Sequence, residues 1–276
     1  MNIVHWCNRI ITICFGLLFG LVPLLLSPWN YELFEYNKMM AVYALTVVIV
    51  GTWIIKMIAQ KEIRIVRTPL DLPIFLFLGS QLLSSIFSID PHVSWFGYYS
   101  RFNGGMFSII CYALLYWAYT SNMTDKTNML RIIKVALVSA VLVSLYGVAE
   151  RLGIDKHLWV QDVQNRVFST LGQPNWLAAY LVAITPVVFA LWLQCQMSNV
   201  KCQMKKPLIY LALVILFFTV LLFTRSRSGL LGFAIADVMF WVFVFIRHRL
   251  ASQDDVFRAW RGFSLLHLSF VIVMFL

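Results

Sequence analysis

The sequence predicts an all-α membrane protein, a polytopic bundle of about nine transmembrane helices. Three observations favour this fold class. Hydrophobic residues make up 61% of the 276 residues and charged residues only 12%, roughly half the charged fraction of a typical soluble domain. The mean hydropathy is +0.80. The apolar residues gather in runs of about 16 to 20 residues, close to the length that a helix needs to cross a bilayer.

Each predicted helix is an apolar run bounded by short polar or charged connectors. The nine ranges are 10–27, 39–57, 72–88, 105–120, 132–149, 176–195, 208–224, 229–246 and 263–276. The first range also resembles a secretory signal, but Ser27-Pro28-Trp29-Asn30 lacks a small-x-small cleavage site, which favours a retained helix. Because the last range ends without a polar flank, we expect the chain to be an amino-terminal fragment of a longer protein.

The basic residues predict the orientation of the bundle. With a cytoplasmic N-terminus, fifteen of the 22 Lys and Arg residues fall in inner connectors and seven in outer ones, as the positive-inside rule requires. The net charge of +10 is therefore explained by membrane topology, and no nucleic acid partner is expected. The inner cluster Arg247-His248-Arg249 suits contact with anionic membrane lipid. The cysteines and histidines show no metal-type spacing, so no metal or other cofactor is expected.

Two polar, arginine-bearing segments interrupt the apolar pattern on the predicted outer side. They are Arg166-Val167-Phe168-Ser169-Thr170-Leu171-Gly172-Gln173-Pro174-Asn175 and Thr224-Arg225-Ser226-Arg227-Ser228-Gly229. Each comes directly before a helix whose amino end would point outward, with free N–H groups and the positive end of the helix dipole. Arginine forks beside such helix starts suit phosphate or pyrophosphate. The predicted substrate-binding residues are Arg166, Gln173, Asn175, Arg225, Arg227 and Ser228, with Arg101 before a third helix start.

Each arginine also has an ordinary explanation. Arginines near helix ends often extend to the membrane interface and only anchor the helix, and for Arg101 both interpretations stay open. Arg225 and Arg227 lie in a very short outer connector, against the bias that keeps positive charge inside, which favours a functional role. Arg166 is distinguished by its spacing to the Gly-Gln-Pro-Asn sequence that follows it.

Titratable residues outside these segments give weaker signals. His92 and His157 are the only histidines on the predicted outer side, and either could act as a general base. Neither has a carboxylate at an informative spacing, so the catalytic residue stays unknown. Asp237 within a predicted span is either a functional group or a structural partner.

Carboxylates near the ends of the predicted helices have ordinary explanations. Glu150 and Arg151 are interpreted as a surface pair at a helix end. Asp155 and Asp162 are interpreted as solvated loop charges.

Both arginine-bearing segments resemble signatures of the O-antigen ligase and O-antigen polymerase family. Arg166 followed by Ser169 to Asn175 and then Leu177-Ala178 is similar to an arginine followed by G-T-x-G-N-P-N-x-L-A. Thr224-x-Ser226-Arg227-Ser228 resembles T-x-S-R-G/S, and the segment from Trp95 to Gly105 also resembles a stretch that many members carry upstream. Two positions depart from the pattern: Gln173 stands where Asn is commoner, and Ser169 where Gly is.

The resemblance extends from about Ser88 to Phe245 and implies two regions. Residues 1–87 would be amino-terminal transmembrane helices, and 88–276 an O-antigen-ligase-like membrane domain truncated at its C-terminal end. Such proteins are multi-pass glycosyltransferases of the bacterial inner membrane. They take a glycan from undecaprenyl pyrophosphate at the outer face of that membrane and pass it to a lipid, polysaccharide or protein acceptor.

The resemblance also implies residue roles. Family arginines that match Arg166 and Arg227 hold the pyrophosphate, and the transfer needs no metal. The family's catalytic histidine lies in a late outer loop beyond this sequence, so we expect the chain to bind the donor without turning it over.

Two other function classes stay open from the sequence. A transporter or flippase of an anionic or lipid-linked substrate could use the same outward helix starts, although transporters usually show repeats and broken helices, and no internal repeat is present. A structural membrane subunit would leave the outer arginines unexplained.

Overall fold

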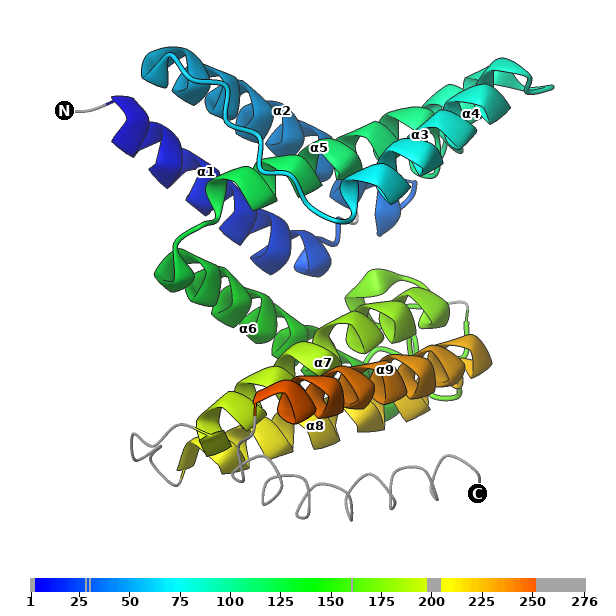
Figure 1. The fold of residues 1–276 in the computed structure, drawn as a ribbon. Coiled ribbons are helices and arrows are strands. Elements are labelled where there is room, and N and C mark those ends of the chain that lie inside the picture. Colours follow the sequence, from blue (N-terminus) through cyan, green and yellow to red (C-terminus); the bar gives the residue numbers. More distant parts are fainter. Residues whose placement is uncertain (1–2, 28, 30, 160, 198–204, 252–276) are drawn as a thin grey trace. The chain divides into compact units, whose positions relative to one another are not determined.

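The computed structural model describes residues 3–27, 29, 31–159, 161–197 and 205–251, and every regular element in these ranges is a helix (Figure 1). The first elements are α1 (Ile3–Gly20), the 3-10 turn η1 (Val22–Leu24), α2 (Glu35–Gln60), α3 (Asp71–Ile86), α4 (Pro91–Phe96) and α5 (Met106–Asn122). They are followed by α6 (Lys126–Arg151), η2 (Ser169–Leu171), α7 (Pro174–Met197), α8 (Lys205–Phe223) and α9 (Arg227–Ala251).

The described residues divide into two compact units on either side of the Ser139–Ala140 bond, which lies within α6. In the first unit α1, α2 and α5 pack together. Their shared core contains Ile11, Phe15, Ile49 and Ala118, each at most 1% exposed. Helices α3 and α4 also pack against α5.

The second unit contains the last part of α6 together with α7, α8 and α9. Helix α7 contacts both α8 and α9 (Figure 1). Leu177, Leu181 and Phe189 of α7 and Phe217 and Leu221 of α8 are nearly inaccessible. Helix α7 is therefore the central element of this unit.

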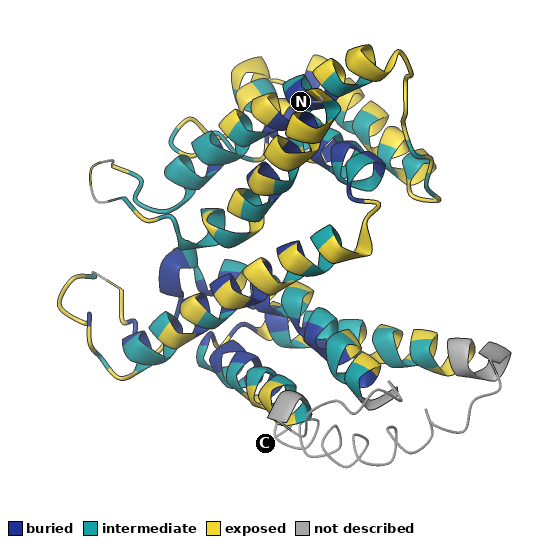
Figure 2. Ribbon diagram, turned by 90° about the vertical axis from the view of Figure 1, so that its left-hand side faces the viewer, coloured by how far each residue is buried: buried dark blue, intermediate teal, exposed yellow. Residues whose placement is uncertain are grey.

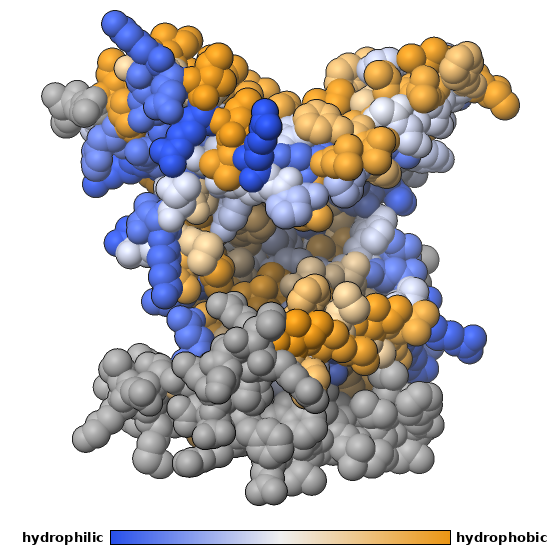
Figure 3. Space-filling view, viewed as in Figure 1, coloured by the Kyte–Doolittle hydropathy of each residue, from blue (hydrophilic) through white to orange (hydrophobic). Residues whose placement is uncertain are grey.

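Within the described ranges, five helical segments are long and apolar enough to cross a membrane: Ile3–Leu24, Glu35–Gln60, Lys126–Arg151, Pro174–Cys195 and Arg227–Ile246. Several of them expose apolar side chains that a soluble helix would bury (Figures 2 and 3). On α9, Leu231, Ile235 and Val238 follow the spacing of one helix face and are 57% to 62% exposed. Such a face is suited to contact with lipid. The helices thus have the composition of a membrane protein.

The first eight predicted ranges each overlap an α-helix, whereas the ninth, 263–276, lies outside the described residues. The expected number of nine spans is not reached in the described part of the chain. Two of the overlapping helices, α3 and the Pro207–Phe223 part of α8, are apolar but short. The cytoplasmic N-terminus, and the 1–87 and 88–276 regions implied by the resemblance, stay predictions.

Two local differences from the predicted helices have clear causes. The first helix begins at Ile3, before Arg9, and turns into the 3-10 segment at Val22 because Pro23 has no N–H for a helical hydrogen bond. The short helix α4 was not predicted. Asp90 caps it by accepting a hydrogen bond from the Val93 N–H at 3.2 Å, and Pro91 occupies its first position.

Candidate anion-binding site

The second arginine-bearing segment forms the turn between α8 and α9 and the first residues of α9, and Ser226 caps α9. The Ser226 Oγ accepts a hydrogen bond from the Gly229 N–H at 3.1 Å, the bond that an N-cap serine makes to the third helical residue. The Thr224 Oγ1 accepts from the Ser226 N–H at 3.2 Å and donates to the Leu221 carbonyl at 2.7 Å. These small polar residues therefore fix where α9 begins.

The amino ends of α7 and α9 lie side by side. The Ser226 Oγ donates to Asn175 Oδ1 at 2.8 Å and so links the first turn of α7 to the cap of α9. A side chain at Gly229 would overlap the Cβ of Ala178 in the second turn of α7, so glycine permits this close approach. Two helix amino ends with their positive dipole ends are thereby placed next to each other.

The two arginine-bearing segments are also joined through their backbones. The Val167 N–H donates to the Phe223 carbonyl at 3.2 Å, and the Arg166 Nε donates to the Thr224 carbonyl at 3.4 Å. Among the described residues the Arg166 guanidinium has no carboxylate partner. Its guanidinium is therefore oriented by a neutral carbonyl, and no described carboxylate forms an ion pair with it.

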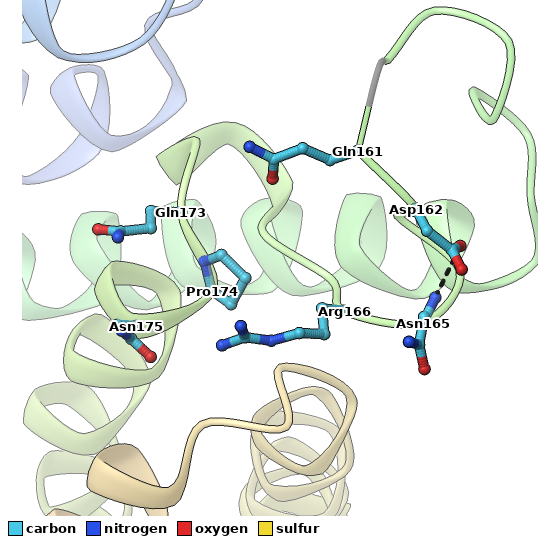
Figure 4. A pocket seen from close by; sticks show the side chains of 7 residues that line it. All are labelled: Gln161, Asp162, Asn165, Arg166, Gln173, Pro174 and Asn175. Atoms are coloured by element: carbon cyan, nitrogen blue, oxygen red, sulfur yellow. Dashed lines mark hydrogen bonds between the residues drawn. The ribbon is translucent and has the colours of Figure 1, made fainter.

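A pocket of about 340 Å³ lies between the segment before Val167 and the start of α7 (Figure 4). Its lining residues are Gln161, Asp162, Asn165, Arg166, Gln173, Pro174 and Asn175. The Arg166 side chain extends toward Pro174 and Asn175, whereas Asp162 and Asn165 lie at the other end (Figure 4). The Asp162 Oδ1 accepts from the Asn165 N–H at 3.1 Å and so shapes that end. One end of the pocket is consequently basic and the other carries a carboxylate.

The predicted site residues differ in where the structure places them. Arg166, Gln173 and Asn175 line one pocket. Arg225 lies in the α8–α9 turn, and Arg227 and Ser228 lie in the first turn of α9. All three are exposed and are not among the lining residues. Among the described residues neither Arg225 nor Arg227 has a hydrogen bond or ion pair from its guanidinium. Their role as substrate-binding residues stays a prediction.

Arg101 lies in the first unit and has an anionic partner. Its Nε lies 3.2 Å from Glu35 Oε2, and the two side chains are 44% and 15% exposed. The turn around it is tightly built: Phe102 adopts a positive φ of 52°, and its carbonyl accepts from the Tyr43 hydroxyl at 2.8 Å. Glu35 thus compensates the charge of Arg101, and a role of Arg101 in substrate binding stays a prediction.

Two acidic residues differ from the sequence-based interpretation, which took Glu150 for half of a surface pair with Arg151 and Asp155 for a solvated charge. Glu150 is 0% exposed and Asp155 is 5% exposed. Arg151 instead donates to the Gln164 carbonyl and lies over the Phe223 ring. Asp155 accepts from the Tyr146 hydroxyl and the Trp159 Nε1–H, both at 2.7 Å. The signal available in the sequence was a glutamate at the end of a long apolar run, a position where an ionisable residue is costly.

In the part of the chain that the structure describes, the geometry identifies no general base. His92 and His157 are exposed, and the contact described for His92 is with the Phe96 ring at 5.1 Å. Among the described residues no group of three or more His, Cys, Asp or Glu side chains could hold a metal ion. The chemistry that this arrangement offers is the binding of an anion by Arg166 and by the polar groups at the starts of α7 and α9.

Comparison of the chain with family models, with curated proteins and with solved structures finds no match. The resemblance to O-antigen ligases and polymerases therefore rests on the motif residues alone and stays a prediction.

Proposed function

We propose that the protein is a membrane glycosyltransferase of the O-antigen ligase or polymerase type. Its donor is a glycan linked to undecaprenyl pyrophosphate, and its acceptor is a lipid, polysaccharide or protein. It acts at the outer face of the bacterial inner membrane. The proposal combines the motif resemblance with the helical, apolar composition of the chain.

The observation that carries the proposal is the position of Arg166. Its guanidinium extends into a pocket beside the first turn of α7, and a main-chain carbonyl is its one described hydrogen-bond partner. A diphosphate needs several donors and positive charge at close range. Gln173 and Asn175 add amide groups at the same place. Arg225 lies in the adjoining α8–α9 turn, and Arg227 and Ser228 lie in the first turn of α9.

In the proposed reaction an acceptor hydroxyl attacks the anomeric carbon of the first sugar. The bond between that carbon and the pyrophosphate oxygen breaks, and the electron pair leaves with undecaprenyl pyrophosphate. Positive groups already in place around the diphosphate stabilise the negative charge that develops on it. The hydroxyl proton passes to a general base, which is not assigned to any described residue.

Binding of polyprenyl pyrophosphate to the protein in nanodiscs tests the proposal. The Arg166→Ala variant should bind about tenfold to a hundredfold more weakly, because hydrogen bonds to charged groups contribute about 1.5–3 kcal/mol. Arg166→Lys should be impaired less, because it keeps the charge but loses the two-pronged geometry. Lys156→Ala is the matched control, since it removes one exposed positive charge from the same unit.

Two outcomes decide between the function classes. Equal affinity of the wild type and Arg166→Ala would remove the basis of the proposed site. Movement of the intact lipid-linked glycan across the vesicle membrane would favour the transporter or flippase instead. Inorganic pyrophosphate, tested in parallel, separates recognition of the diphosphate from recognition of the lipid chain.

A further inference from the structure

One face of α6 supports the main chain of the motif segment. Val143, Gly147 and Glu150 lie three and four residues apart and so share a helix face. A Cβ on Gly147 would lie 3.1 Å from the Val167 side chain and 3.7 Å from that of Ser169. The absence of a side chain at Gly147 thus lets residues 167–169 approach the helix closely.

Glu150 holds this segment by its backbone. Its Oε2 accepts hydrogen bonds from the Phe168 N–H at 3.1 Å and from the Ser169 N–H at 2.6 Å. Its Oε1 is buried and has no hydrogen-bond partner among the described residues. Both amides are buried, and without Glu150 they would lose this acceptor where water cannot easily replace it.

Ser169 has a conformation that needs such support. Its φ is 53°, in the left-handed region that a residue with a side chain rarely adopts. The Ser169 Oγ donates to the Val143 carbonyl at 2.6 Å, so the same face of α6 fixes both its main chain and its side chain. A non-glycine residue persists in this region when its surroundings constrain it.

The supported segment connects the two walls of the pocket. Arg166 lies just before it, and Gln173 and Asn175 follow after the Gly172 turn. We infer that Glu150 is a positioning residue for the anion pocket: by accepting the Phe168 and Ser169 amides it fixes the distance between the Arg166 wall and the α7 wall. The role of the pocket in holding a diphosphate rests on the proposed function, whereas the fixing of the segment does not.

The test compares Glu150→Ala, Glu150→Gln and the wild type in nanodiscs by amide hydrogen exchange of the 166–172 segment and by polyprenyl pyrophosphate binding. Glu150→Ala should speed exchange of that segment and weaken binding, each by about tenfold or more, because both amides lose their acceptor. Glu150→Gln keeps one oxygen that can accept both bonds, so exchange and affinity should stay within about threefold of the wild type.

Asp155→Asn is the matched control. It removes a second buried carboxylate of the same unit that accepts no hydrogen bond from the 166–172 backbone. Its exchange and binding should equal those of the wild type, which would show that loss of a buried charge alone does not open the segment.

The outcomes separate the two proposals. Unchanged exchange in Glu150→Ala overturns the positioning role, whatever the ligand. Faster exchange with unchanged diphosphate affinity overturns it as well, because the segment would then be structural only. If the wild type binds no diphosphate but Glu150→Ala speeds exchange and Glu150→Gln restores protection, the proposed function fails and the fixing of the segment by Glu150 stands.

Discussion

Arg101 and Arg166 each precede a turn that leads into a helix, but they differ in the partner of their guanidinium group. Each arginine is followed by glycine and asparagine residues, and the next α-helix begins within about ten residues. Arg101 forms an ion pair with Glu35 at 3.2 Å, whereas Arg166 donates to the Thr224 carbonyl at 3.4 Å and lines a pocket. An arginine already paired with a carboxylate gains less from an incoming phosphate, because that phosphate must compete with the existing partner.

The difference has a simple origin in the neighbouring residues. Glu35 is the first residue of α2, in the same unit as Arg101. The acidic lining residue nearest to Arg166 in the sequence is Asp162, and it lies at the other end of the pocket (Figure 4). A sequence motif with an arginine before a helix start therefore indicates where positive charge is placed. Whether this charge is available to a ligand depends on whether the fold places an acidic side chain from a distant part of the sequence beside the arginine.

The largest change in diphosphate affinity is expected when Arg166, like Arg101, is given an acidic neighbour. Gln173→Glu keeps the size of the side chain and adds a carboxylate to the pocket lining. We expect diphosphate affinity to fall by about tenfold or more, because like charges at a binding site cost about 1.4 kcal/mol or more. Titration of polyprenyl pyrophosphate at low and high salt measures the effect, which should shrink as salt screens the repulsion.

Gln173→Ala provides the control for the loss of the amide, with an affinity expected to fall less than in Gln173→Glu, because this variant removes a hydrogen-bonding group without adding a negative charge. Equal losses in Gln173→Glu and Gln173→Ala would mean that the amide, and not the electrostatics of Arg166, determines binding.

Removing the carboxylate at the far end of the pocket should have the opposite effect and increase the affinity for diphosphate. Asp162→Asn keeps an oxygen that can accept from the Asn165 N–H, so the local turn is retained. We expect affinity for diphosphate to rise about twofold to fivefold, because a repulsive charge in a partly solvated pocket is screened. A weaker affinity in this variant would show that Asp162 acts through the turn or through a ligand contact, and the same titration measures it.

The smallest effect is expected from mutating the ion pair between Arg101 and Glu35. A double-mutant cycle of Arg101→Ala and Glu35→Gln should give a coupling free energy of about 0.5–1 kcal/mol in thermal unfolding in detergent, as is typical of a partly exposed pair. Diphosphate affinity of Arg101→Ala should stay within about twofold of the wild type. A tenfold loss would instead place Arg101 in the binding site despite its pairing with Glu35.

Much of the helical architecture could be predicted from the sequence, because the length and position of an apolar run are local properties. The runs at 39–57 and 132–149, for example, lie inside α2 and α6. The cap of α9 by Ser226 and the start of α7 at Pro174 also follow from local residue preferences. Helix α4 was missed, although Asp90-Pro91 carries the same kind of signal.

By itself the sequence determined that the chain is helical and apolar, and which polar residues stand at the helix starts. Tertiary structure alone decided which of them come together: Asn175 with Ser226, Arg166 with Thr224, and Arg101 with Glu35. It also placed Glu150 inside the protein beneath Phe168 and Ser169. Local propensities act over a turn or two of chain. Hydrogen bonds and ion pairs between distant residues depend on how the helices pack, which no short stretch of sequence encodes.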